Sequence, residues 1–337
     1  MFFSMGTTRI AINGFGRIGR HAFKIIAATK GMEVVAINDL TDSRTLSHLL
    51  KYDTAYPDFA SAVSYDEKNI IVAKKKIPVY AEKEPQLLPW KKLKVDVVLE
   101  CTGRFTSKEG AELHLKAGAK KVVISAPTKS ADVPTFVIGV NEKQYKGESI
   151  VSNASCTTNC ASPVMKVLED TFGIEKAMLT TVHSYTATQP LQDGPSKDLR
   201  EARAAAQNMV PTTTGAAIAT TLTIPQLAGK FDGLSVRVPT ITVSMVDITA
   251  VLKKEVTKEQ LNSAFIKATK GPMKSVLAVS EAPLVSSDFI GDEHSATVDL
   301  PLTYVVGGNL VKVIAWYDNE WGYANRLVEM AKLVAKR

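Results

Sequence analysis

Cys156 is the residue whose surroundings most clearly suggest chemistry. It stands in the run SCTTNC (residues 155–160), where Thr- and Ser-rich residues would open a helix. A thiol at a helix N-terminus has its thiolate stabilised by the helix dipole, which makes it a nucleophile near neutral pH. Cys160 would lie one helical turn deeper and be buried. Spacing alone leaves a catalytic and a structural role of Cys156 both open.

A metal site is the other reading of two cysteines four residues apart. The chain has only one further cysteine, Cys101, and its five histidines are scattered. A zinc site needs four clustered ligands, so we predict no metal.

His183 is the candidate base for this nucleophile. It ends a run of apolar and Thr residues (179–182) and precedes the hydroxyl-rich stretch 184–188, as a residue at a strand terminus would. An imidazole there could pair with the thiolate and exchange a proton with the substrate oxygen. A lone histidine is more often structural, so its role also stays open at this point.

A glycine-rich loop follows the first apolar run, residues 9–12. Gly14, Gly16 and Gly19 stand between a predicted strand and a predicted helix. Gly14 would permit the tight turn, Gly16 would let backbone approach a pyrophosphate, and Gly19 would let the helix pack closely. Asp39 lies 20 residues further on, where a carboxylate can bind ribose hydroxyls and repel a 2′-phosphate. The pattern predicts NAD binding, although these residues could also form only a turn.

A third set of residues offers donors for phosphate oxygens. Hydroxyl, backbone and guanidinium groups of this kind bind anions when they converge in space, which the sequence does not show. The candidates are Thr186, Thr188, Arg203, Thr214, Gly215 and Arg237.

The elements that would position these groups change in character near residue 150. Before it, short apolar runs (33–37, 95–100, 121–125) alternate with helical stretches (20–29, 108–117), which is typical of a doubly wound parallel sheet. After one more helix (160–172), the strands become longer and richer in Thr and Val, which favours a largely antiparallel sheet in a second, α+β domain. We expect those strands at 177–183, 234–252, 295–304 and 310–317, a functional loop at 184–207, and a last helix at 325–336.

Composition limits the class of protein. The 337 residues suggest about two domains, and three cysteines cannot all pair, which favours a reducing compartment and a cytoplasmic protein. We expect no membrane span, because no segment of about 18 apolar residues occurs. The net charge of +7 is spread along the chain, so it indicates a basic surface that tolerates anionic small ligands, and nucleic acid binding is not indicated.

Four segments together resemble the phosphorylating glyceraldehyde-3-phosphate dehydrogenase family, bacterial-type and NAD-dependent. They are INGFGRIGR (12–20), SNASCTTNC (152–160), HSYT (183–186) and WYDNEWGY (316–323). The likeness runs from about residue 9 to the C-terminus. It implies an N-terminal Rossmann domain (1–154), onto which the C-terminal helix (319–337) packs back, and an α+β catalytic domain (155–318).

The resemblance also implies an activity and a set of site residues. Cys156 would attack glyceraldehyde 3-phosphate, His183 would be the base, and inorganic phosphate would release an acyl phosphate from a thioester in a homotetramer. The NAD contacts would come from Asn13, Gly14, Phe15, Gly16, Arg17, Ile18, Asp39, Lys83, Ser125 and Asn319. The substrate phosphate would be bound by Thr186, Thr188 and Arg237, and the attacking phosphate by Ser155, Thr157, Thr214 and Gly215, with Arg203 as a further anion donor.

Several positions depart from the family pattern. Glu201 and Ile218 stand where many relatives carry basic residues, residues 56–58 replace a usual His-Gly turn, and Lys83 stands where arginine is common. We expect altered affinity rather than altered chemistry. Three other functions fit less well: an erythrose-4-phosphate dehydrogenase, a non-catalytic binding protein, and a cysteine hydrolase, which would leave the glycine loop without a purpose.

Overall fold

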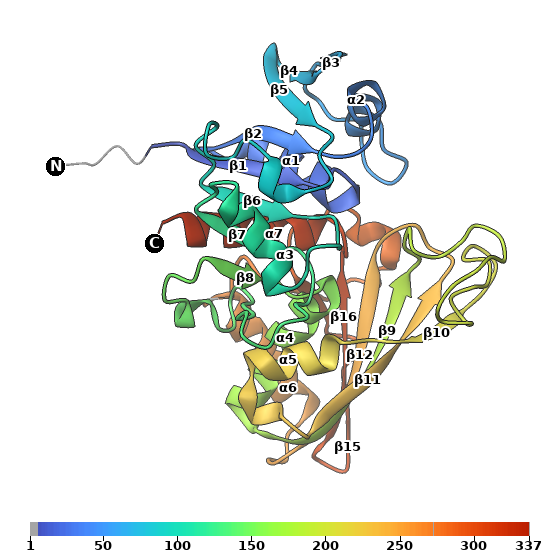
Figure 1. The fold of residues 1–337 in the computed structure, drawn as a ribbon. Coiled ribbons are helices and arrows are strands. Elements are labelled where there is room, and N and C mark those ends of the chain that lie inside the picture. Colours follow the sequence, from blue (N-terminus) through green and yellow to red (C-terminus); the bar gives the residue numbers. More distant parts are fainter. Residues whose placement is uncertain (1–5, 272, 337) are drawn as a thin grey trace. The chain divides into compact units, whose positions relative to one another are not determined.

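The computed structural model describes residues 6–271 and 273–336, which divide into two compact units (Figure 1). The first holds the described residues up to Phe136, together with Lys143–Ala154 and the residues from Ala324 onward. The second holds Val137–Glu142 and Ser155–Tyr323.

The first unit is built on an eight-stranded sheet in the order β3-β4-β5-β2-β1-β6-β7-β8. In this spatial order, neighbouring strands are parallel along β5-β2-β1-β6-β7-β8. Strands β3, β4 and β5 form an antiparallel edge. The chain winds outward from β1 to β2 and then returns to β6 on the other side of β1, so ligands are expected at the carboxyl ends of these strands. The strands are β1 Thr8–Asn13, β2 Met32–Asn38, β3 Val63–Asp66, β4 Asn69–Val72, β5 Lys75–Tyr80, β6 Val97–Glu100, β7 Lys121–Ile124 and β8 Ile150–Ser152.

Side-chain caps begin two of the helices in this unit. The Asp42 carboxylate accepts from the backbone N–H of Thr45, and Ser107 Oγ accepts from that of Gly110, so each satisfies an N–H that the first helical turn leaves free. The helices are α1 Arg17–Ala28, α2 Ser43–Lys51, α3 Lys108–Lys116 and the short η1 Pro85–Leu87, while η2 Glu142–Gln144 and α7 Trp321–Ala335 each begin in the second unit's sequence and end in the first's.

The second unit contains a mixed, mainly antiparallel sheet in the order β10-β11-β9-β12-β16-β14-β13, with β15 paired to β16. Among the strands of its described residues, only the β9–β11 and β13–β14 pairs are parallel. The predicted fold class is therefore confirmed in both parts. The strands are β9 Ile174–Ser184, β10 Val210–Thr213, β11 Phe231–Val238, β12 Ser244–Leu252, β13 Leu277–Ser280, β14 Ala296–Asp299, β15 Tyr304–Val306 and β16 Leu310–Tyr317.

Two of the predicted strands are wrong in their extent. The stretch 234–252 is divided between β11 and β12, and 295–304 between β14 and β15. Pro239 and Pro301 lie in the two gaps, and a proline has no N–H to give to a strand ladder. Val243, just before β12, also has a positive φ of 68°, which no regular strand accommodates.

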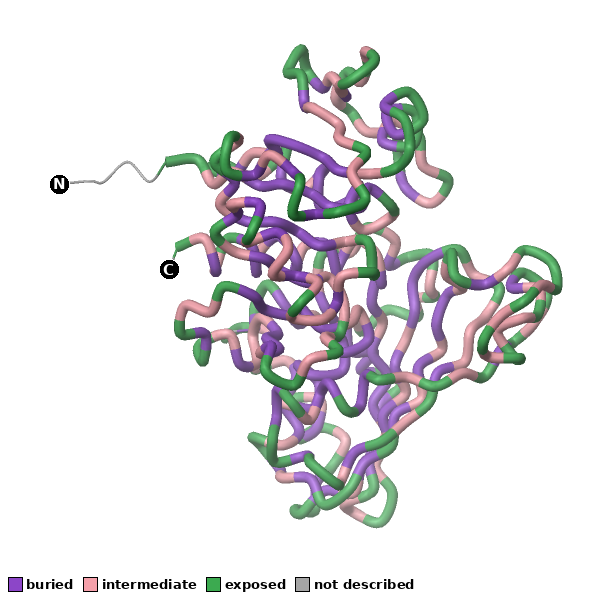
Figure 2. Tube along the Cα trace, viewed as in Figure 1, coloured by how far each residue is buried: buried purple, intermediate pink, exposed green. Residues whose placement is uncertain are grey.

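Helices of the second unit cover one face of its sheet (Figure 1). Strand β12 alternates buried and half-buried residues along its whole length, as expected of a sheet with one covered face (Figure 2). The buried apolar side chains of α4 and β12 join a single core. The helices are α4 Cys156–Phe172, α5 Ala216–Thr223, α6 Lys258–Thr269 and the short η3 Pro225–Leu227 and η4 Ser286–Phe289.

Candidate active site

The glycine loop between β1 and α1 is shaped by two close approaches. Gly14 has φ +92°, and a Cβ there would lie 2.7 Å from the backbone nitrogen of Thr102. A Cβ on Gly19 would lie 2.1 Å from the Gly14 carbonyl oxygen. Only glycine fits either position. Gly16, in contrast, is exposed, has an ordinary φ of −69° and has nothing within 4 Å of its Cβ position. The side of the loop with open space for a ligand is therefore at Gly16.

Asp39, at the end of β2, is tied directly to this loop. Its Oδ2 accepts from the backbone N–H of Phe15 at 2.7 Å, and its Oδ1 accepts from that of Thr41 at 2.9 Å. Arg17, the first residue of α1, pairs with Asp53 at 2.7 Å, and its guanidinium lies 5.6 Å from the centre of the Tyr56 ring. The Tyr56 stretch that departs from the family pattern thus packs against the start of α1.

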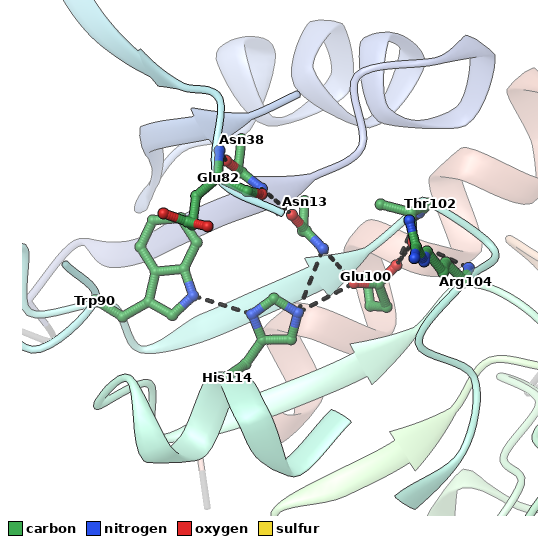
Figure 3. Close-up of polar contacts among 8 residues, drawn as sticks. All are labelled: Asn13, Asn38, Glu82, Trp90, Glu100, Thr102, Arg104 and His114. Atoms are coloured by element: carbon green, nitrogen blue, oxygen red, sulfur yellow. Dashed lines mark hydrogen bonds and ion pairs between the residues drawn. The ribbon is translucent and has the colours of Figure 1, made fainter. Parts of the chain in front are cut away.

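A buried polar network stands behind the loop (Figure 3). The Glu100 carboxylate, at the end of β6, accepts from Asn13 Nδ2 at 2.5 Å and from the backbone N–H of Thr102 at 2.8 Å. His114 Nε2 lies 3.0 Å from the same carboxylate. The Trp90 indole N–H can only donate, and it donates to His114 Nδ1 at 3.1 Å, so we assign the His114 proton to Nε2. This network fixes the ends of β1 and β6 on which the loop rests.

The first unit fits a dinucleotide. Gly16, at the start of α1, has open space around it, and the first turn of α1 carries no acidic side chain to repel a phosphate from the N–H groups at the helix N-terminus. Ser125 follows β7 at the same edge of the sheet as Asn13 and Asp39. Ile18 is half-buried in α1, and Lys83 is exposed in the loop after β5.

Cys156 is the first residue of α4, at the helix N-terminus where its motif placed it, so the helix begins four residues before the predicted range 160–172. Ser155 caps this helix, because its Oγ accepts from the backbone N–H of Thr158 at 3.1 Å. Cys156 Sγ lies 3.4 Å from His183 Nε2. Burial raises the pKa of the Cys156 thiol, and the positive charge of Arg237 opposes that rise. The predicted nucleophile and the predicted base, 27 residues apart in the chain, are therefore in contact.

His183 lies near the end of β9, next to Arg237 of β11 in the sheet register. Its Nδ1 lies 2.7 Å from the Ser184 carbonyl oxygen and 2.6 Å from Arg237 Nη1. Burial, and after it the charge of Arg237, lowers the pKa of His183 to about 3. The imidazole is therefore neutral at neutral pH in this arrangement.

Tyr317 belongs to this cluster, although the sequence reasoning gave it no role. Its hydroxyl lies 2.9 Å from Thr157 Oγ1 and 3.0 Å from Thr181 Oγ1, and its ring meets the His183 ring edge-on at 6.1 Å between centroids. Tyr317 ends β16, so the signal for its position was the expected strand 310–317 with an aromatic residue at its end.

The remaining anion donors are only partly brought together. The hydroxyls of Thr186 and Thr188 lie 2.8 Å apart just after β9, and Thr214 and Gly215 precede α5. Arg203 pairs with Asp193 at 2.8 Å. Among the described residues, no hydrogen bond joins Arg203, Thr214 or Gly215 to the Cys156–His183 pair.

Two departures from the family pattern are explained by their surroundings, and Asn319 has partners in its own unit. Glu201 Oε1 accepts from Thr212 Oγ1 at 3.0 Å, which gives the carboxylate a local partner. Ile218 is 68% exposed, so an apolar residue there disturbs no buried contact. Asn319 Oδ1 accepts from Ser184 Oγ and Ser244 Oγ, both at 3.1 Å.

The described ranges hold neither a candidate metal cluster nor a candidate membrane-spanning helix. Within residues 6–271 and 273–336, no group of three or more His, Cys, Asp or Glu is arranged to hold a metal ion. No helix in the same ranges is both long and apolar enough to span a bilayer.

Comparison with known proteins gives matches to both parts of the chain. The model for the NAD binding domain of glyceraldehyde 3-phosphate dehydrogenase matches residues 8–108, and the model for its C-terminal domain matches residues 155–319. Glyceraldehyde-3-phosphate dehydrogenase 1 of Bacillus cereus is 53% identical over 332 residues, which cover 98% of this chain and 99% of the relative. Glyceraldehyde-3-phosphate dehydrogenase of Geobacillus stearothermophilus is 52% identical, with 98% of each chain covered. The chloroplastic glyceraldehyde-3-phosphate dehydrogenase A of Chlamydomonas reinhardtii is 52% identical, with 98% and 89% covered.

Proposed function

Because the chain belongs to the glyceraldehyde-3-phosphate dehydrogenase family, we propose that it oxidises glyceraldehyde 3-phosphate to 1,3-bisphosphoglycerate, with NAD and inorganic phosphate, in glycolysis. The observation that carries this proposal is the 3.4 Å contact between Cys156 Sγ and His183 Nε2 at the start of α4. A nucleophile paired with a base is what covalent aldehyde oxidation requires.

NAD would be held in the first unit by the glycine loop. The N–H groups at the start of α1 would meet the pyrophosphate, and Asp39 would meet the ribose hydroxyls. When bound, NAD supplies the hydride acceptor. The negative charge of Asp39, already anchored to the loop through Phe15, favours NAD over NADP.

Cys156 and His183 would carry out the covalent steps. His183 takes the thiol proton, the sulfur attacks the aldehyde carbon, and His183 returns that proton to the former carbonyl oxygen to give a thiohemiacetal. His183 then accepts the hydroxyl proton of the thiohemiacetal as hydride leaves the same carbon, and a thioester on Cys156 results. Inorganic phosphate attacks the thioester carbon, and Cys156 leaves as the thiolate.

The anion donors would divide between two phosphates. Thr186, Thr188 and Arg237 would bind the phosphate of the aldehyde. Ser155, Thr157, Thr214 and Gly215, with Arg203 as a further donor, would bind the attacking phosphate. The Thr186–Thr188 contact and the position of Arg237 beside His183 support the first group.

Assembly, location and domain boundaries are part of the same proposal. We assign the chain to a cytoplasmic homotetramer. The NAD-binding domain would span residues 1–154 and the catalytic domain residues 155–318, with the C-terminal helix (319–337) belonging to the former. The grouping of residues from Ala324 onward with the first unit supports this assignment of the helix.

The test is NADH absorbance with purified protein, glyceraldehyde 3-phosphate and NAD, with and without inorganic phosphate. We expect many turnovers that require phosphate, and none from Cys156→Ser. A single burst despite added phosphate would mean that the thioester forms but the phosphate site fails, and Glu201→Arg and Ile218→Lys would then be tested. No NADH from folded protein with a free thiol would overturn the proposal, and D-erythrose 4-phosphate would be tried next.

A further inference from the structure

A hydrogen-bond donor and a hydrogen-bond acceptor both face Nδ1 of His183. Arg237 Nη1, at 2.6 Å, can only donate a hydrogen bond. The Ser184 carbonyl oxygen, at 2.7 Å, can only accept one. A single ring nitrogen either carries a proton or offers a lone pair, so Nδ1 can satisfy one of these neighbours at a time.

The hydrogen bond that Nδ1 makes determines whether His183 can act as a base toward Cys156. If Arg237 donates to Nδ1, the one proton of the neutral ring sits on Nε2, 3.4 Å from Cys156 Sγ. Nε2 then has no lone pair to take the thiol proton. If Arg237 leaves, Nδ1–H can donate to Ser184 and Nε2 becomes the base. Arg237 therefore selects between an inactive and an active tautomer.

The charge of Arg237 lowers the pKa of His183, which disfavours the imidazolium, and it also lowers the pKa of the Cys156 thiol, which favours the thiolate. Burial first and Arg237 second lower the pKa of His183, while the hydrogen bond with the Ser184 backbone and, after it, the charge of Glu320 raise it. The other titratable groups at the ring are the buried Cys156 thiol and the Tyr317 hydroxyl, whose pKa burial holds well above its ordinary value. With Arg237 in place, the imidazolium that would balance a Cys156 thiolate is disfavoured as well.

Arg237 itself lacks an acidic partner. Among the described residues no carboxylate forms an ion pair with it, and its buried Nε has no hydrogen-bond partner. Its Nη1 reaches only His183 Nδ1 and, at 3.4 Å, the Ser184 carbonyl. A guanidinium with one donor unused and another aimed at an imidazole would bind a phosphate dianion more favourably, because the fork of donors matches phosphate oxygens.

We propose that Arg237 is a substrate-operated switch: it holds His183 in the inactive tautomer until the phosphate of a phosphorylated aldehyde draws its guanidinium away and frees His183 as the base. This inference rests on the proposed function, in which Arg237 binds that phosphate. The phosphate of the substrate would then accelerate the chemical step as well as binding, so specificity for phosphorylated aldehydes would appear in kcat.

The direct test observes the His183 ring in the unaltered protein. Histidine labelled with ¹⁵N distinguishes the two neutral tautomers by NMR, and His183→Asn identifies the signal. Without added ligand we expect the proton on Nε2. With glycerol 3-phosphate, which carries the phosphate but no aldehyde, we expect it on Nδ1 or on both nitrogens. A ring that stays protonated only on Nε2 with saturating glycerol 3-phosphate, or that carries the Nδ1 proton without it, would overturn the switch.

A second test measures the rate at which iodoacetamide alkylates Cys156 at pH 7. In the wild type, glycerol 3-phosphate should raise this rate, because His183 Nε2 then has a lone pair that can take the thiol proton. Arg237→Gln should react at the raised rate with or without the ligand. Lys176→Gln removes an exposed positive charge from the same strand as His183 and should behave as the wild type.

These readouts separate the switch from the enzymatic activity. Neither needs hydride transfer, so they can succeed in a protein that makes no NADH. If Arg237→Gln is alkylated more slowly than the wild type, Arg237 acts only as a positive charge beside the thiolate and the switch is wrong, even if the dehydrogenase activity is present.

Discussion

The Tyr317 hydroxyl and Thr157 Oγ1 are joined by a 2.9 Å hydrogen bond. Thr157 is the residue directly after Cys156. The same phenol hydroxyl lies 3.0 Å from Thr181 Oγ1 of β9, the strand that carries His183. A single buried hydroxyl therefore ties α4, which begins with Cys156, to β9, which carries His183. The Tyr317 ring also packs edge-on against His183.

Tyr317→Phe should lower both stability and catalysis. The Thr157 hydroxyl loses its partner in a buried position, which costs about 1–3 kcal/mol. We expect urea unfolding to show that loss, and kcat to fall while the KM for NAD stays unchanged. Tyr304→Phe is the matched control, because Tyr304 is 51% exposed. Equal stability of both variants would show that the Tyr317 bonds contribute nothing.

Gly16→Ala and Gly19→Ala should separate cofactor binding from folding. The Gly19 Cβ position is 2.1 Å from a carbonyl oxygen, so alanine there forces the turn apart and destabilises by about 1–3 kcal/mol or more. Gly16 has open space, so its variant should keep its melting temperature but bind NAD more weakly. Titration calorimetry with NAD, together with thermal unfolding, measures both quantities. Unchanged NAD affinity in Gly16→Ala would place the pyrophosphate elsewhere.

Asp39→Asn should relax the preference for NAD over NADP. The amide keeps an oxygen to accept from the Phe15 N–H but loses the charge that repels a 2′-phosphate. Asp39→Ala loses both and should also weaken the loop. The measurement is the ratio of kcat/KM for the two cofactors. An unchanged ratio in both variants would mean that other residues set the preference.

Cys156 should react with iodoacetamide before the other two cysteines. All three thiols are free, but Cys160 is fully buried, and burial raises the pKa of Cys101 and Cys160 without a basic partner beside them. Cys156 has His183 within 3.4 Å. Peptide mapping after partial labelling gives the order. Earlier labelling of Cys101 would contradict the nucleophile assignment.

His183 should make the protein less stable in acid. Its pKa falls from an ordinary 6.5 to about 3 in the folded chain, so between these values the unfolded chain binds a proton that the folded chain does not. The stabilisation is complete above pH 6.5 and is lost as the pH falls, with a slope approaching about 1.4 kcal/mol per pH unit. His183→Asn should remove that contribution. Urea unfolding at pH 4.5, 5.5 and 7.5 tests this, and an unchanged slope in the variant would contradict the assignment.

The sequence by itself determined the local chemistry and the class of fold. The glycine spacing before α1, the alternation of short apolar runs with helices, and the polar start of the Cys156 helix all depend on neighbours in the chain. Such neighbours set turn geometry, helix ends and strand periodicity. For that reason the doubly wound sheet and a helix N-terminus at Cys156 could be predicted, although the helix range was placed at 160–172. The breaks within 234–252 and 295–304 were missed, although Pro239 and Pro301 mark them in the sequence.

Only the tertiary structure decided which distant residues meet. His183 reaches Cys156 through the packing of β9 against α4, Arg237 reaches His183 through the register of two parallel strands, and Tyr317 reaches both Thr157 and Thr181 from the end of β16. None of these contacts has a periodic signature, because strand order and register are set by how the sheet buries its apolar face. The donor of Arg237 and the acceptor of Ser184 meet at His183 Nδ1 only when that packing is complete.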